Sequence, residues 1–62
     1  MEKIYEWTTK EGEKAQYRFT NDMCDGFFLD DKLIDEKGYK GKHLTESWNE
    51  NLSNAGFVVI TP

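Results

Sequence analysis

Residues 43–62 read HLTESWNENLSNAGFVVITP, and this stretch decides the fold because a helix pattern leads directly into a strand pattern. Its apolar positions recur at steps of four, four and three, as on one stripe of a helix: Leu44, Trp48, Leu52 and Ala55. A helix of about twelve residues is marginal in water by itself. We therefore expect a helix over about residues 44–55 that packs its stripe on a sheet.

The start of this helix has two candidate caps. Thr45 can cap the first turn directly. Ser47 with Glu50 forms an alternative capping box, which would leave Leu44 outside the helix. The span 44–55 is preferred because only that span uses the whole apolar stripe.

The end of the helix and the segment after it are more clearly marked. Gly56 can take the left-handed conformation just after the C-cap, and such an ending would bring Phe57 onto Leu52. Residues 57–61 then form a continuous apolar, β-branched run that Pro62 closes. We expect this run to be a strand covered on both faces, inside the sheet and beside the first strand.

Residues 4–20 have the pattern of a β-hairpin. A three-residue loop over residues 10–12, with Gly12 in the left-handed position, sets Tyr5 opposite Tyr17. A two-residue turn would mix apolar and charged side chains on both faces, so the pattern selects the longer loop. The aromatic side chains then share one face of the sheet, which the helix would cover.

A second, shorter hairpin is expected from residues 27–29 and 33–34, joined across residues 30–32. Together these elements predict an α+β fold: a small three- to four-stranded, mainly antiparallel sheet with one helix packed on one face, in the order β-β-(β-β)-α-β. Residues 1–62 are expected to form a single domain, because a chain of this length supports one small core.

Composition is that of a compact domain, with 32% charged residues and a formal net charge of −4. No apolar segment is long enough for a membrane helix, and the N-terminus lacks the pattern of a signal peptide. The single Cys24 cannot form an internal disulfide and is flanked by acids that disfavour a reactive thiolate. We therefore expect a cytoplasmic protein with no membrane partner.

Charge is unevenly distributed along the chain. Residues 21–36 contain a single lysine and six acids, which are Asp22, Asp25, Asp30, Asp31, Asp35 and Glu36. Their spacing does not fit an EF-hand, because leucine and glutamate fall where that loop needs a ligand and a glycine. We expect neither a metal site nor a cofactor. The acids either keep the sheet soluble or form a surface that a basic partner recognises.

The acidic segment is followed by a basic loop over residues 37–43, which contains Lys37, Lys40, Lys42 and His43. It also has a GxxG spacing and leads into a helix start, both of which can favour anions. Neither a KH loop nor a Walker loop is satisfied, because the surrounding elements or residues differ from those motifs. A single histidine and no recognisable nucleophile constellation give no support for catalysis.

We therefore expect a non-enzymatic protein-binding module: a small acidic regulator or inhibitor of a basic, nucleic-acid-handling partner. Phe27, Phe28 and Tyr39 are the aromatic side chains that could anchor that contact. One alternative is an anion or nucleic-acid binder through the basic loop and the following helix start; nucleic acid is the less expected partner because the net charge repels a polyanion. The other alternative is a homodimer through an aromatic sheet face, so the protein is expected to be a monomer or a homodimer.

Overall fold

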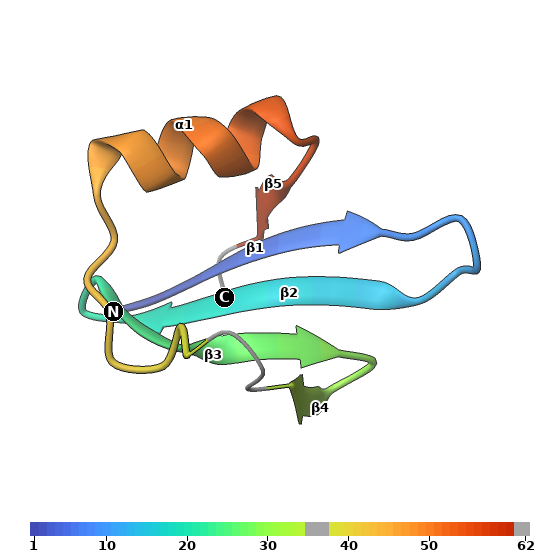
Figure 1. Ribbon diagram of the computed structural model, residues 1–62, viewed down its shortest axis with the longest axis horizontal. Coiled ribbons are helices and arrows are strands. Elements are labelled where there is room, and N and C mark those ends of the chain that lie inside the picture. Colours follow the sequence, from blue (N-terminus) through green and yellow to red (C-terminus); the bar gives the residue numbers. More distant parts are fainter. Residues whose placement is uncertain (35–37, 61–62) are drawn as a thin grey trace.

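The computed structural model describes residues 1–34 and 38–60. It shows an antiparallel sheet with one helix on one face, so the α+β class is confirmed (Figure 1). The strands are β1 (Glu2–Thr8), β2 (Lys14–Thr20), β3 (Met23–Leu29), β4 (Lys32–Ile34) and β5 (Val58–Ile60), and the helix α1 is Glu46–Asn54. The sheet has five strands in the order β4-β3-β2-β1-β5, where three or four strands were expected.

The β1–β2 hairpin has the register predicted from its turn. Gly12 is left-handed, with a φ of 84°, and the amide of Thr9 donates to the carbonyl of Glu13 at 2.8 Å. Tyr5 consequently pairs with Tyr17 across the two strands. The aromatic side chains of both strands therefore lie on one face of the sheet.

Two tight turns build the rest of the sheet, and both are made by acidic or amide residues. Asn21 and Asp22, between β2 and β3, have φ values of 50° and 66°. Asp30 and Asp31, between β3 and β4, have φ values of 48° and 69°. Two successive left-handed residues are typical of type I′ hairpin turns, whose twist matches the flanking strands. The second hairpin was predicted, but β3 begins at Met23 rather than at residue 27.

The helix begins later than expected. Thr45 is the N-cap, and its hydroxyl accepts a hydrogen bond from the amide of Trp48 at 3.1 Å. Leu44 therefore lies outside the helix, although it still packs against the core. The cap at Thr45 forms in place of the capping box of Ser47 and Glu50. It satisfies a free amide of the first turn without shortening the helix further.

The helix end has the predicted geometry. Gly56 has a φ of 101°, and its amide donates to the carbonyl of Ser53 at 3.1 Å. The next amide, that of Phe57, donates to the carbonyl of Leu52 at 3.0 Å. This pair of bonds is a Schellman ending, and Phe57 packs against the cluster that contains Leu52.

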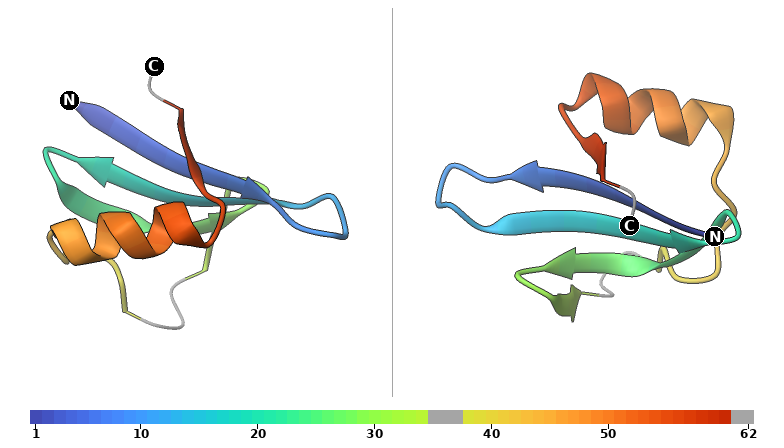
Figure 2. Two further views of the ribbon diagram at one scale, coloured as in Figure 1. Left: turned by 90° about the horizontal axis from the view of Figure 1, so that it is seen from above. Right: turned by 180° about the vertical axis from the view of Figure 1, so that it is seen from behind.

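The position of β5 corrects the expectation that the last strand lies inside the sheet. It pairs with β1, as predicted, but it forms the edge of the sheet (Figure 2). Val58, Val59 and Ile60 are 60%, 46% and 38% exposed. The free edge of β1 is the only place beside it, because β2 already occupies its other side. An apolar run alone does not distinguish an edge strand from a central one.

The core lies between α1 and the sheet. Its buried members are Tyr5, Phe19, Cys24 and Leu52. Tyr5 and Phe19 are each 1% exposed, and their rings meet edge to face at a centroid distance of 5.5 Å. The Tyr5 hydroxyl donates to Asn49 Oδ1 at 2.6 Å, which ties the sheet to the helix. Dimerisation through an aromatic sheet face requires this face to be open, and α1 covers its centre.

The opposite face of the sheet carries a polar network and no described helix (Figures 1 and 2). Gln16 is 5% exposed; its amide donates to Glu6 at 2.8 Å and its carbonyl oxygen accepts from Arg18 Nε at 2.8 Å. The Arg18 guanidinium also pairs with Asp31 at 2.6 Å and lies 4.0 Å from the centroid of Phe28. Glu6, Gln16, Arg18 and Asp31 are therefore linked in one network on this face.

Candidate functional site

The acidic residues do not gather at one place. Asp22 and Asp25 lie near the start of β3, whereas Asp30 and Asp31 lie in the turn after its end. All seven residues of β3 lie between Asp22 and Asp30, a length of about 20 Å, and four residues lie between Asp25 and Asp30. Asp35 and Glu36 lie outside the described residues, as does Lys37. The described acids thus occupy opposite ends of the sheet and not a single surface.

Each described acid also has a local structural role. Asp22, Asp30 and Asp31 occupy left-handed turn positions, which asparagine and aspartate tolerate better than most residues. The Asp30 carboxylate also accepts from the amide of Lys14 at 2.9 Å. Asp25 accepts from the hydroxyl of Thr20 at 2.6 Å. Asp22, Asp30 and Asp31 thus shape turns, and Asp25 bonds to the neighbouring strand β2.

The three aromatic anchor candidates are divided between the two faces of the sheet. Phe28 is under the Arg18 guanidinium on the face away from the helix. Phe27 pairs with Tyr17 on the helix side, with a centroid distance of 4.9 Å. Tyr39 comes from the loop before the helix and also contacts Tyr17, at 5.2 Å. Only Phe27 and Tyr39 therefore approach the same part of the molecule.

The loop that carries Tyr39 is a β-turn fixed against β3. The amide of Lys42 donates to the carbonyl of Tyr39 at 3.1 Å, and Gly41 between them has a φ of 87°. A left-handed glycine at the third position is the signature of a type II turn. Two further backbone hydrogen bonds hold the turn to Cys24. The amide of Gly41 donates to the carbonyl of Cys24, and the amide of Cys24 donates to the carbonyl of Lys42, both at 2.8 Å.

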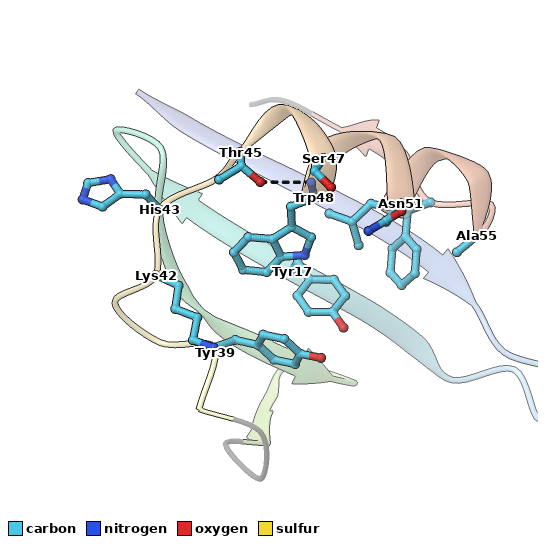
Figure 3. Close-up of a pocket in the computed structure, with 11 residues that line it drawn as sticks. Tyr17, Tyr39, Lys42, His43, Thr45, Ser47, Trp48, Asn51 and Ala55 are labelled. Carbon is cyan, nitrogen blue, oxygen red and sulfur yellow. Dashed lines mark hydrogen bonds between the residues drawn. The ribbon is translucent and has the colours of Figure 1, made fainter.

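This turn and the helix enclose an open pocket of about 620 Å³ above the sheet (Figure 3). Its lining includes four aromatic rings from different segments: Tyr17 from β2, Tyr39 from the turn, Trp48 from α1 and Phe57 from the segment after the helix. All four residues are partly buried. The structure therefore assembles an aromatic site from four separate segments of the chain.

The rings support one another edge to face. Tyr17 meets Tyr39 at an interplanar angle of 84° and Trp48 at 79°. Tyr39 and Trp48 are 5.6 Å apart and inclined by 31°. Such edge-to-face contacts are favourable and hold the side chains in one arrangement. The pocket wall is thus formed before any ligand arrives.

The electrostatics of the pocket differ from those of the chain as a whole. The chain has twelve acids and eight bases, but none of the residues lining the pocket is acidic. Lys42 lines it and extends toward Tyr39, whereas the His43 ring points away (Figure 3). Burial, together with the neighbouring Tyr39 hydroxyl, raises the pKa of Tyr17, which therefore stays neutral. Lys42 is the only lysine, arginine or acid among the residues that line the pocket.

The helix contributes polar groups to the rim. Thr45, Ser47 and Asn51 line the pocket. The Thr45 hydroxyl is used by the cap. The side chains of Ser47 and Asn51 make no hydrogen bond with another residue in the described part of the chain. They are available to a ligand.

The basic loop and the aromatic candidates are therefore brought together in part. Tyr39, Lys42 and His43 all contribute to the pocket lining, whereas Lys40 does not. Tyr17 and Trp48, which are expected in the core from the sequence, are also part of this site. The signal for the turn is the tetrapeptide of residues 39–42, in which glycine stands third.

Two other classes of site have no support in the described residues. Within residues 1–34 and 38–60, no group of three or more histidine, cysteine or acidic side chains is arranged to hold a metal ion. The helix in the described part of the chain is too short and too polar to cross a membrane. Comparisons with protein-family models, with curated proteins and with solved structures found no match to this chain. The aromatic pocket is thus the candidate functional site in the part of the chain that the structure describes.

Proposed function

We propose that this chain is a non-enzymatic protein-binding module whose partner docks on the aromatic pocket. The observation that carries the proposal is the wall of four partly exposed aromatic rings, preformed between the helix and the turn of residues 39–42. Tryptophan and tyrosine in such pockets dominate the energetics of many protein interfaces. They bury a large apolar area while few rotamers are lost.

The frame of the pocket favours binding over chemistry. Its backbone is held by the cap at Thr45 and by the two bonds to Cys24, so little ordering is needed when a partner arrives. The lining contains no acid, and the ring of His43 points out of it (Figure 3). General acid–base catalysis needs a proton donor or acceptor aimed at the bound group. This site supplies a binding surface instead.

The acidic residues take a secondary part in this proposal. The net charge of −4 attracts a basic partner over a distance of about one Debye length. Because the described acids lie at two ends of the sheet and shape its turns, they affect the rate of encounter more than the strength of the complex. The protein is thus proposed to be an acidic regulator or inhibitor whose acids speed the encounter and whose pocket holds the partner.

Capture experiments test the proposal. Tagged wild-type protein and the Tyr39→Ala variant are incubated with lysate of the source organism, with and without nuclease, and bound proteins are identified by mass spectrometry. We expect a partner that resists nuclease and is lost with Tyr39→Ala. A protein captured equally by both forms would show that the pocket is not the docking site.

An anion or nucleic-acid binder is the second candidate, and Lys42 is the observation that favours it. Its ammonium group is the one formal charge among the pocket residues, beside rings on which a base could stack. This alternative predicts capture of nucleic acid that decreases steeply with salt and is abolished by nuclease. The same experiment therefore separates the two candidates.

A further inference from the structure

We infer that the pocket accepts an aromatic side chain that stands beside a carboxylate on the partner protein. This inference rests on the proposed function and specifies the chemistry of the segment that docks. Three features of the site carry it: the shape of the aromatic wall, the charge of the lining and the placement of Lys42 relative to the rings.

The rings form a wall and not a slot. A ring held between two aromatic faces needs those faces about 7 Å apart, twice the usual contact distance. Tyr39 and Trp48 are only 5.6 Å apart, and Tyr17 closes the space below them with edge contacts to both. An incoming side chain therefore packs on the exposed part of this wall. A flat apolar group makes the largest contact with it.

The charge of the lining decides which flat group fits. Aromatic faces by themselves attract cations. Here Lys42 lies on the same rim, and no acid lines the pocket to offset it. A lysine or arginine of the partner would be repelled at this point, whereas a carboxylate would be attracted. The chain as a whole carries a net charge of −4 and attracts cations, whereas the pocket attracts an anion.

The turn of residues 39–42 brings the aromatic ring of Tyr39 and the charge of Lys42 to the same pocket. Tyr39 and Lys42 are its first and last residues, and the hydrogen bond between their backbones brings these ends together. Both side chains line the pocket (Figure 3). A ring on the wall and a carboxylate that meets Lys42 can therefore come from residues that lie close together in the partner's chain. Ser47 and Asn51, on the helix side, can bond to the partner's backbone.

Three small probes with one indole ring test this inference. N-acetyltryptophan carries a carboxylate, N-acetyltryptophanamide is its neutral counterpart, and tryptamine is a cation. Each is titrated into isotope-labelled protein at low ionic strength, and amide shifts are followed by nuclear magnetic resonance. The affinities are expected to be weak, with a Kd on the order of 1 mM for the anion. We expect the anion to bind about three-fold more tightly than the amide, and tryptamine to bind most weakly.

Two lysine variants locate the effect. Lys42→Ala is expected to make the anion and the amide bind equally, with shifts still centred on Tyr39, Trp48 and Asn51. Lys40→Ala removes the same charge from the same turn, but its side chain is outside the pocket lining, so the preference should remain. Both lysines are exposed, so neither change should unfold the protein.

The other outcomes overturn the inference. Equal binding of the three probes by the wild type, or tightest binding of tryptamine, would contradict the assigned charge preference. If adenosine monophosphate bound more tightly than N-acetyltryptophan, and did so through Lys42, the ligand of the pocket would be a nucleotide and not a peptide segment. Absence of pocket shifts with every probe would remove the site. A wrong charge preference leaves the proposed function intact, because the loss of a captured partner with Tyr39→Ala is measured separately.

Discussion

Tyr39 and Lys42 occupy the first and last positions of one β-turn, and the amide of Lys42 donates to the carbonyl of Tyr39 at 3.1 Å. This relationship places an aromatic ring and an ammonium group at the edge of the same pocket. It depends on Gly41, which has a φ of 87°. The geometry of the candidate site thus depends on one backbone conformation.

Gly41→Ala should therefore damage the site through the backbone. No described atom lies within 4 Å of the position a Cβ would take, so the strain is conformational and costs about 1 kcal/mol of stability. Binding of N-acetyltryptophan should weaken as well. Gly12→Ala is the matched control: it has a φ of 84° and equal space, in the β1–β2 loop. It should lower stability in urea denaturation by a similar amount and leave probe binding unchanged.

The two candidate caps make separable predictions for the helix. Thr45→Ala removes the acceptor for the Trp48 amide and should destabilise the protein by about 1 kcal/mol. Ser47→Ala should change stability by no more than a few tenths of a kcal/mol, because Ser47 lies within the helix as an exposed residue. Urea denaturation of both variants measures the difference. A larger loss with Ser47→Ala would show that the other capping box forms.

The bond between Tyr5 and Asn49 should contribute to the attachment of the helix. Tyr5→Phe removes the hydroxyl that donates at 2.6 Å and should cost about 1 kcal/mol. The Asn49 side chain that loses its partner is on an exposed residue, so water can replace the donor. A double-mutant cycle with Asn49→Ala isolates the pairwise part. A coupling energy near zero would show that the bond adds nothing to stability.

Stability should fall at high pH in a way that depends on Tyr17. Its pKa is raised in the folded protein, chiefly by burial, so the folded state keeps this proton after the unfolded chain has begun to lose it near pH 10. The contribution is complete below that pH and is lost as the pH rises toward the folded-state pKa. Urea denaturation at pH 8 and pH 11 should show a smaller decrease for Tyr17→Phe than for the wild type. An equal decrease would contradict the raised pKa.

Local signals in the sequence predict a large part of the fold. Gly12 selects the loop that sets Tyr5 opposite Tyr17, because a two-residue turn would place charge on the core face. Gly56 selects the helix ending, because only a left-handed residue there satisfies the last carbonyls. In both cases one glycine and a few neighbours determine the geometry, and both predictions are confirmed.

Features that depend on distant segments are harder to predict. The hairpin joined across residues 30–32 is predicted, but its first strand begins at Met23 and not at residue 27, because its pairing with β2 starts beyond the apolar run. The edge position of β5 depends on where the helix returns its chain to the sheet. The pocket joins Tyr17, Tyr39 and Trp48 from three elements, and no short stretch of sequence contains their spacing.

The most direct test of the central claim is the affinity of the captured partner for a set of variants, measured by calorimetry at physiological salt. Tyr39→Ala should weaken binding about 30-fold, the effect of losing roughly 2 kcal/mol at an anchoring side chain. The controls are Lys40→Ala and a variant with Asp22, Asp30 and Asp31 all changed to asparagine, which keeps left-handed turns while removing charge. Each control should change the affinity less than about three-fold, with all proteins measured below their unfolding temperature. Wild-type affinity for Tyr39→Ala, together with lost binding in the asparagine variant, would contradict the account and make the acidic turns the docking surface.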